Sequence, residues 1–478
     1  MDFLRINGNR FVDESNNTVV LRGVNIGGWM NMEDFINCYP GSESGTRKAM
    51  AAAIGKQKAD FFFNRMLDYI FAEEDAAFLS SLGFNALRLP LNYRHFEKDS
   101  EPFVYLEEGF RRLDAALALC EKYGLYAILD LHAVQGWQNT DWHCDNPGRH
   151  SLLWSHGQFQ ERFTRLWQAI AERYASRPVV AMYDLMNEPI VNARYGRFSS
   201  HYQPNWEVFN RVNKAGVEAI RQVDAKHIIL LEGDNFSNEF AGMEAPFADN
   251  LAYSSHNYIS SGIFGKYPGL AGDVYWDNAK QREVFYNAEG TQFAQKHGVP
   301  LVISEFGSVY NGPKDEIPDR LRSLDDQLAL FNEFGASWTI WTYKDPGVMS
   351  LASLNPESEF IQVLQPVIRK KDLLNSHFGV NWLPENKSKK MCNELADYME
   401  QIIGMEHVDT AANRKYLAQS VFSEFGAIQL QPAYAQCFKG MTEERIDEVL
   451  SSFALSKCIQ NTEHIAILQK HAAKGSQK

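Results

Sequence analysis

Short apolar runs alternate with helical patterns along the chain as far as residue 345. Eight mostly apolar runs are typical of buried strands, and they span residues 19–29, 85–91, 126–132, 179–189, 227–234, 251–258, 300–307 and 337–345. Between them, apolar residues recur every three or four positions, which predicts helices over 71–82, 106–123, 158–174, 204–222, 283–297 and 325–335. Continuously apolar strands that alternate with helices belong to parallel sheets. This order predicts an α/β fold, the closed (β/α)₈ TIM barrel.

The pattern changes after Asp345. One more helix is expected near 357–370, and residues 386 to 473 read as several helices without a strand. We therefore divide the chain into a catalytic barrel, residues 1–375, and an α-helical C-terminal extension, residues 376–478. The extension is interpreted as a packing cap on the barrel. The alternatives are an accessory subdomain or a dimerisation element that would form a homo-oligomer through the C-terminal helices.

Composition narrows the kinds of partner. The chain has 47 Lys and Arg against 60 Asp and Glu, a net charge of −13, and this argues against nucleic-acid and membrane partners, which need basic patches. Ten Trp and 20 Tyr slightly favour a carbohydrate ligand, because flat rings pack on sugar faces. Six scattered Cys without a C-x-x-C pair are expected to be free thiols, and no signal peptide is recognisable. The predicted location is cytoplasmic.

In a barrel of this kind the active site lies at the carboxyl ends of the strands. Polar and aromatic residues recur there, namely Gly28 and Trp29, Arg88, His132, Asn187 and Glu188, Glu232 and Asp234, His256 and Tyr258, Glu305, and Trp341. Two of these carboxylates suit the cleavage of a glycosidic bond. Glu188 ends strand four in N-E-P, and Glu305 ends strand seven in S-E-F-G. Such cleavage needs one acid with a raised pKa and one ionised carboxylate.

These motifs resemble glycoside hydrolase family 5, the cellulase-like retaining β-glycosidases, over about residues 15–345. The family has eight characteristic residues, and each has a match here: Arg88, His132, Asn187, Glu188, His256, Tyr258, Glu305 and Trp341. The resemblance implies that Glu305 is the nucleophile and that Glu188 is the general acid/base. It also implies that Arg88 and Tyr258 keep Glu305 ionised and oriented.

The remaining family residues are expected to bind the sugar or to support the acid. Asn187 would hold the 2-hydroxyl group, His132 would bind ring hydroxyls, and Trp341 would form the floor beneath the sugar. His256 would support Glu188. The His residues lack the H-E-x-x-H spacing of a metal site, and no nucleotide-binding loop is present. We therefore expect neither a metal nor a cofactor.

The opening segment LRGVNIGGWMNMEDFI bears on exo or endo action. It resembles the exo-β-glucanase and β-glucosidase branches, in which a Glu after G-G-W binds the terminal sugar and closes the pocket. The matching residue is Glu33, and the alternative is a loop carboxylate that faces water. The WTYKDPG segment after strand eight and the helical tail depart from that branch, which leaves the sugar open.

Together these features predict an exo-acting retaining β-glycosidase. It would release terminal β-linked glucosyl or mannosyl residues from short oligosaccharides or glycosides by double displacement. The alternatives are an endo-β-1,4-glucanase or endo-β-mannanase, and a non-catalytic sugar-binding barrel, which the intact pair Glu188 and Glu305 disfavours.

Overall fold

Eight parallel strands close into a barrel in the computed structural model, which describes residues 1–192, 202–376, 387–404 and 410–473. The strands are β4 (Arg22–Asn25), β5 (Ala86–Asn92), β8 (Tyr126–Ala133), β9 (Val180–Asp184), β10 (Ile228–Glu232), β11 (Leu251–His256), β14 (Leu301–Glu305) and β15 (Ser337–Ile340). Each strand pairs in parallel with the next along the chain, and β15 pairs with β4 to complete the ring. The predicted TIM barrel is confirmed.

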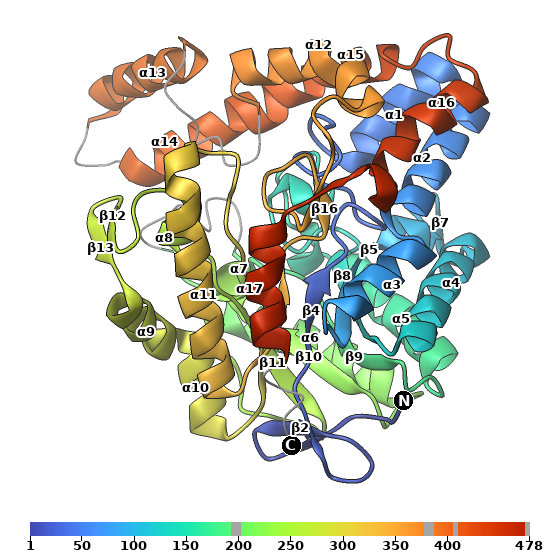
Figure 1. The fold of residues 1–478 in the computed structure, drawn as a ribbon, viewed down its shortest axis with the longest axis vertical. Coiled ribbons are helices and arrows are strands. Elements are labelled where there is room, and N and C mark those ends of the chain that lie inside the picture. The colour runs from blue at the N-terminus through green and yellow to red at the C-terminus, as the bar shows by residue number, and fades with distance from the viewer. Residues whose placement is uncertain (193–201, 377–386, 405–409, 474–478) are drawn as a thin grey trace.

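Helices surround the barrel and bury the outer faces of the strands (Figure 1). They are α3 (Glu73–Ser81), α4 (Glu107–Tyr123), α5 (Gly157–Tyr174), α6 (Trp206–Arg221), α9 (Asn278–Asn287), α10 (Glu289–His297) and α11 (Ile317–Phe334). Helix α12 (Glu359–Leu374) lies apart from them, at the carboxyl end of the barrel, as the top of Figure 1 shows. The predicted helix over 283–297 is two helices, because the backbone at Ala288 is extended. Gly124, Gly298 and Gly335 end their helices in the left-handed conformation, which costs glycine little.

The amino end of the barrel is closed by the start of the chain. Strands β1 (Arg5–Asn7), β2 (Arg10–Val12) and β3 (Thr18–Val19) form a small antiparallel sheet at the bottom of Figure 1. Leu4 and Phe11 lie in one buried cluster with strand residues such as Ile128 and Val302. The opposite, carboxyl end therefore remains for ligands.

Two long helices follow the first strand, where the sequence pattern predicts no element. They are α1 (Glu43–Ile54), capped by the side chain of Ser42, and α2 (Lys56–Ile70). They form the platform on which the C-terminal helices pack. Helix α15 (Ala427–Gln436) lies against α1, and α16 (Glu443–Leu450) lies against α2.

The C-terminal helices reach the carboxyl end of the barrel, as Figure 1 shows at the top. They continue with α13 (Lys387–Ile403), α14 (Thr410–Gln419), a π-helical turn over 420–426, and α17 (Thr462–Ala473), which packs on α11. Gln431 donates to the carbonyls of Pro40 and Ser42 after β4. The expectation of no strand in this region is wrong in one detail, because β18 (Ile459–Gln460) pairs with β17 (Ala352–Ser353). A two-residue strand leaves no apolar periodicity to detect.

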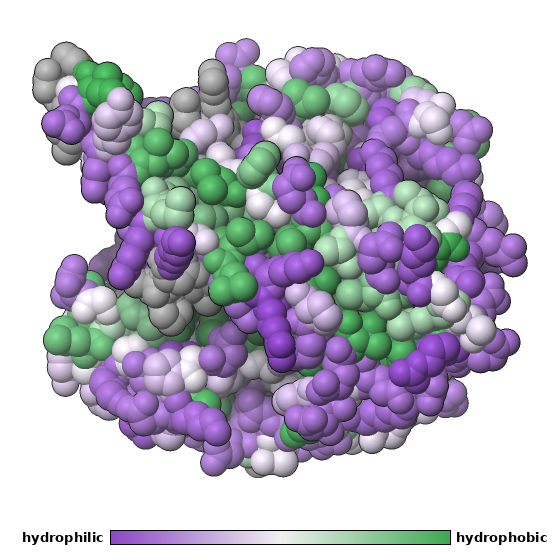
Figure 2. Space-filling view, turned by 90° about the horizontal axis from the view of Figure 1, so that it is seen from above, coloured by the Kyte–Doolittle hydropathy of each residue, from purple (hydrophilic) through white to green (hydrophobic). Residues whose placement is uncertain are grey.

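Helix α13 has an exposed apolar face. Its exposed hydrophobic residues are Met391, Leu395, Tyr398, Met399, Ile402 and Ile403. Figure 2 looks down on this end of the molecule and shows hydrophobic residues in patches among hydrophilic ones. Self-association through the C-terminal helices stays a prediction. Among the described residues, no helix has the length and apolar character needed to cross a membrane.

A buried ion pair joins α3 to the end of the last barrel strand and generates a stability prediction. Lys344 Nζ lies 2.6 Å from Asp75 Oδ1, and both side chains are fully buried. Tyr343 OH donates to the same oxygen at 2.6 Å. Removing one partner of a buried pair leaves an uncompensated charge, which costs about 3–5 kcal/mol. We therefore expect Asp75→Ala to lower the free energy of unfolding by about that amount in urea titrations.

The matched control is Asp60→Ala, which removes the exposed pair between Lys56 and Asp60 on α2. Exposed pairs contribute little, so this variant should unfold close to the wild type. Equal losses in the two variants would contradict the assignment of the Asp75–Lys344 pair as a structural tie.

Candidate active site

Arg88 stands at the centre of the mouth and is fully buried. It lies on β5, so its side chain rises toward the carboxyl end of the barrel. Its guanidinium contacts four carboxylates: Asp184 at 2.9 Å, Glu305 at 2.8 Å, and Asp130 and Glu232 at 3.1 Å each. It also donates to the amide oxygens of Asn25 and Asn187, at 3.1 and 2.9 Å. One side chain therefore fixes groups from five strands or strand ends.

The acids around Arg88 differ in how firmly they hold a proton. Burial raises the pKa of Asp130 to about 8 and holds the pKa of Asp184 well above its usual range, although Arg88 opposes both shifts. Burial also disfavours the charge on Glu232, but His256 and Arg88 outweigh burial and lower its pKa. Burial therefore disfavours the negative charge on two of the four acids that face the cation.

Glu305 ends β14 and is held from two sides. Arg88 Nη1 donates to Oε1 at 2.8 Å, and Tyr258 OH donates to Oε2 at 3.0 Å. Burial and the neighbouring charge of Glu305 hold the pKa of Tyr258 well above its usual value, so the phenol keeps its proton. Two donors on a carboxylate fix its orientation and aim its free lone pairs. This geometry suits a nucleophile.

Glu188 follows β9 in a left-handed backbone conformation, with a φ of 47°. Such a conformation is uncommon for residues other than glycine and is held by its surroundings. The backbone N–H of Glu188 donates to Glu232 Oε2 at 2.7 Å. Its side chain meets one imidazole on each oxygen: His256 Nδ1 lies 2.7 Å from Oε1, and His143 Nε2 lies 3.1 Å from Oε2.

These histidines decide the charge state of Glu188 before substrate binds. Burial alone would raise the pKa of Glu188, but the hydrogen bonds from His143 and His256 outweigh burial and hold it well below its usual range. The pKa of His256 is raised well above its usual value, because Glu305 and Glu232 outweigh the effect of burial. The raised pKa expected of the general acid therefore belongs to its histidine partners.

The two glutamates face each other across a short gap. Carboxylate oxygens of Glu188 and Glu305 lie within 4.8 Å of each other, with His256 between them. Carboxyl groups about 5–5.5 Å apart permit direct attack by one of them on the sugar, whereas inverting enzymes leave about 6.5–9.5 Å for a water molecule. The observed spacing supports double displacement through a covalent intermediate.

Glu33 lies in the same mouth and not on the outer surface. It is 3% exposed, and its Oε1 lies 3.3 Å from His132 Nε2. His132 in turn stacks on Trp341, with ring centroids 5.4 Å apart and planes inclined by 15°. Burial and the charges of Glu305 and Glu188 hold the pKa of Glu33 well above its usual range. The alternative of a carboxylate that faces water is wrong.

Helix α12, which follows the last barrel strand, holds the loop that carries Glu33. Lys371 on α12 is buried, and its ammonium group donates to the carbonyls of Asp34 and Tyr39, at 3.3 and 3.1 Å. From the other side, Asn37 Oδ1 accepts the backbone N–H of Glu33 at 3.0 Å. The position of Glu33 thus depends on α12, which follows the last strand of the barrel.

All nine site residues predicted from the sequence gather at this mouth, together with four further groups. Two of them, Asp130 and Asp184, were missed, whereas Glu232 was noted only as a strand end and His143 only as part of a loop expected on the leaving-group side. A signal existed for Asp130, because it precedes His132 by two positions on β8 and residues two apart in a strand share a face. Glu232 stands out in the sequence only as a strand end. His143 lies in a loop, where no periodicity indicates orientation.

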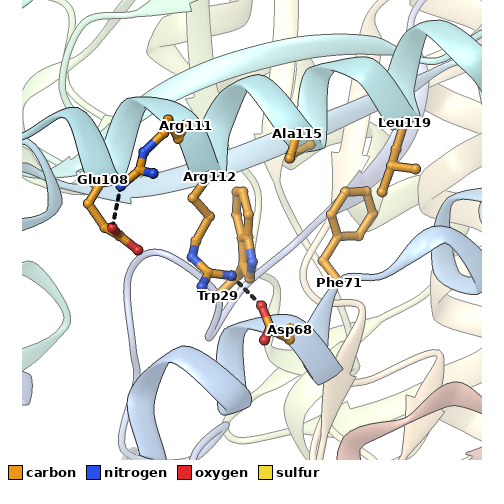
Figure 3. Close-up of a pocket in the computed structure, with 9 residues that line it drawn as sticks. Trp29, Asp68, Phe71, Glu108, Arg111, Arg112, Ala115 and Leu119 are labelled. Atoms are coloured by element: carbon orange, nitrogen blue, oxygen red, sulfur yellow. Dashed lines mark hydrogen bonds and ion pairs between the residues drawn. The ribbon is translucent and has the colours of Figure 1, made fainter. Parts of the chain in front are cut away.

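Trp29, at the end of the first strand, turns away from the mouth. Its ring packs edge-on against Phe71, 5.8 Å between centroids, and lines a hollow of about 360 Å³ between α2 and α4. Figure 3 shows Trp29 between Phe71 and Arg112 in this hollow, where Arg112 pairs with Asp68. The hollow lies outside the barrel, and its walls are helical rather than the strand ends that carry the two glutamates.

Comparison with known proteins agrees with this geometry. Residues 56–347 match the model of the family described as Cellulase (glycosyl hydrolase family 5). The chain is 34% identical over 482 residues to a protein named Beta-xylosidase from Phanerodontia chrysosporium, and the match covers 96% of each chain. It is 26% identical over 358 residues to a probable glucan 1,3-beta-glucosidase A from Emericella nidulans, covering 68% of this chain and 86% of the relative.

Among solved structures, the chain resembles endoglucanase Cel5A from Thermotoga maritima, with a TM-score of 0.48 and 18% identity. That match covers 68% of this chain and 89% of the endoglucanase.

The protonation of Glu33 can be tested through stability. A carboxyl group whose pKa is raised by folding stabilises the folded state fully below its unfolded pKa, and this contribution is lost as the pH rises through the folded value. Glu33→Gln keeps the neutral form at every pH. Its stability relative to the wild type should therefore grow between pH 5 and pH 8, by up to about 1.4 kcal/mol per pH unit.

Thermal unfolding at a series of pH values measures this difference. The matched control is Glu108→Gln, on the exposed side of α4, which should give a constant difference. If the stability difference between Glu33→Gln and the wild type stays constant or shrinks with rising pH, Glu33 is ionised in the folded protein.

Proposed function

The chain belongs to glycosyl hydrolase family 5, the cellulase family, and from this membership we propose that it is an exo-acting retaining β-glycosidase. It removes terminal β-linked sugars from short oligosaccharides or glycosides. Because one relative is named Beta-xylosidase, terminal xylosyl residues join the glucosyl and mannosyl residues expected from the sequence as candidate substrates. The observation that carries the exo assignment is the buried position of Glu33 beside His132 and Trp341.

In the first step, Glu305 attacks the anomeric carbon while the glycosidic oxygen takes a proton from Glu188. Arg88 and Tyr258 hold the carboxylate of Glu305 toward the sugar through contacts of 2.8 and 3.0 Å. Asn187, which accepts from Arg88 at 2.9 Å, is placed to bind the 2-hydroxyl group, a contact that strengthens in the transition state. The leaving group departs as a neutral alcohol.

The second step reverses the role of Glu188. Once Glu305 is esterified, the negative charge beside Glu188 and His256 is gone, so Glu188 acts as a base that takes a proton from water. The 2.7 Å contact between His256 and Glu188 lets the pair share the proton that leaves with the aglycone in the first step and is regained from water in the second. The hydroxide equivalent then attacks the same face from which the aglycone left, and the sugar is released with its original configuration.

Glu33 restricts the pocket to a chain end. Glu33 is 3% exposed, and its raised pKa favours the protonated form, which can both donate to and accept from sugar hydroxyls. The loop that carries it is held by Lys371. A polymer that passes through the mouth would have to displace this loop. This loop therefore supports removal of one terminal sugar at a time.

The roles of the two glutamates are separable by experiment. Glu305→Ala should abolish turnover of every aryl glycoside, because it removes the carboxylate that attacks the anomeric carbon. Glu188→Ala should still form the covalent intermediate from dinitrophenyl glycosides, which leave without acid assistance. Added azide should restore turnover of Glu188→Ala and give a β-glycosyl azide, measured by product NMR.

Glu108→Ala on the exposed side of α4 is the matched control and should keep wild-type rates. Loss of activity in both active-site variants without rescue by azide would remove the support for these roles.

The exo assignment is tested with Glu33→Ala on β-xylosides, β-glucosides and β-mannosides that carry a nitrophenyl group. Removing one partner of a buried hydrogen bond costs about 1–3 kcal/mol, and about 1.4 kcal/mol corresponds to tenfold. We expect kcat/KM to fall by roughly ten- to a hundredfold even on these single-sugar substrates.

The wild type is then given hexasaccharides labelled at the reducing end. Release of single sugars from the far end is expected. Cleavage at the centre before the terminus would replace this proposal with an endo-glycanase, the activity named for several relatives that are 22% identical to this chain.

A further inference from the structure

His143 contacts the side chain of Glu188, and neither the family pattern nor the proposed mechanism uses this contact. It lies on the loop after β8, in a short 3₁₀ turn over Trp142–Cys144. Its Nε2 is 3.1 Å from Glu188 Oε2, on the opposite carboxylate oxygen from His256. The side chain of His143 is 10% exposed and that of Glu188 is 13% exposed, so the contact is shielded from bulk water.

On the basis of the proposed function, we propose that His143 is a positioning residue for Glu188. Together with His256, it fixes the Glu188 carboxylate in the orientation needed for both proton transfers. We call this pair of contacts the clamp. Without this clamp, Glu188 is tied by a single imidazole and can rotate its second oxygen away from the glycosidic bond. The clamp works in both protonation states of Glu188, because an imidazole nitrogen can donate to a carboxylate or accept from a carboxylic acid.

The surroundings of His143 fix its ring from several sides. Asn139 Nδ2 lies 3.0 Å from the same Nε2 and also donates to the backbone carbonyl of Glu188 at 2.9 Å. Asn31, two residues before Glu33, donates to the backbone carbonyl of His143 at 3.0 Å. The ring also meets His132 edge-on, with centroids 6.0 Å apart. The loop after β8 and the loop that carries Glu33 thus position His143 together.

Charged neighbours favour a protonated ring. The carboxylates that face His143 are Glu188 from the end of β9, Asp141 from its own loop and Glu305 from β14, whereas His132 from β8 opposes its charge. Burial acts against the charge, but the carboxylates outweigh it and raise the pKa of His143. Its cation in turn stabilises the ionised form of Glu188, so losing it makes Glu188 harder to deprotonate.

The experiment compares His143→Phe and His143→Gln with the wild type by measuring kcat/KM against pH on a β-glycoside with a poor leaving group. Acid catalysis needs protonated Glu188, and loss of the His143 cation makes Glu188 harder to deprotonate. The basic limb of the profile should therefore shift to higher pH by about one unit in His143→Phe. His143→Gln keeps a donor but no charge. His143→Gln should recover most of the maximal rate that His143→Phe loses. Its basic limb should also shift to higher pH, by less than that of His143→Phe.

A dinitrophenyl glycoside provides the second readout, because its departure does not need the acid. The kcat/KM of His143→Phe on this substrate should stay within a few-fold of the wild type, while the poor substrate loses at least tenfold. His156→Phe, at an exposed position just before α5, is the matched control and should match the wild type on both.

The outcomes separate this proposal from the proposed function. A wild type that hydrolyses no glycoside would defeat the proposed function. If the wild type is active and its His143 variants keep both pH limbs in place, the role of His143 is overturned. The same holds if the variants lose kcat/KM equally on the two substrates. If His143→Phe fails to fold, the limb position of His143→Gln decides alone.

Discussion

The burial of one guanidinium among four carboxylates is the constraint on which the rest of the site depends. Arg88 is fully buried, and removal of such a charge from water is tolerated only with several partners. Asp130, Asp184, Glu232 and Glu305 supply them from four different strands. Because a guanidinium is planar and its donors are fixed, these strands can meet in only one register around it.

This network also divides the acids by function. Burial raises the pKa of Asp130 and Asp184 and so favours their protonated forms, whereas His256 and Arg88 lower the pKa of Glu232 and favour its ionised form. Glu232 then accepts the backbone N–H of Glu188 and thereby fixes the unusual left-handed conformation of the acid/base residue. Arg88 thus reaches both glutamates, Glu305 directly and Glu188 through Glu232. The two carboxylates are held at a fixed separation by a shared cation.

The barrel is predictable from the sequence because each strand is a continuous apolar run that ends in a polar residue. The same regularity, with the rule that ligands bind at the carboxyl ends of the strands, places Arg88, Glu188 and Glu305 at one mouth. Prediction fails where long-range packing sets the orientation of a side chain. Trp29 has the expected position along the chain after β4 but turns outward onto Phe71. His143 belongs to an irregular loop, and its approach to Glu188 depends on contacts with Asn139 and Asn31.

The helices after the last barrel strand are visible in the sequence as helices, but their effect on the site is not predictable from periodicity. Lys371 reads as an ordinary charged residue near the end of a helix, yet its ammonium group is buried against the loop that carries Glu33. Nothing in the local sequence distinguishes it from its neighbour Lys370. The same is true of Gln431, which ties α15 to the turn before α1.

The central claim is that Glu305 and Glu188 act as nucleophile and acid/base, at a separation too short to hold an attacking water molecule as well as the sugar. The most direct measurement is proton NMR of the first sugar released from a β-glycoside, recorded before the anomers equilibrate. The short separation of the two carboxylates predicts the β-anomer. Initial release of the α-anomer would contradict the account, because it would require a single displacement by water from the opposite face.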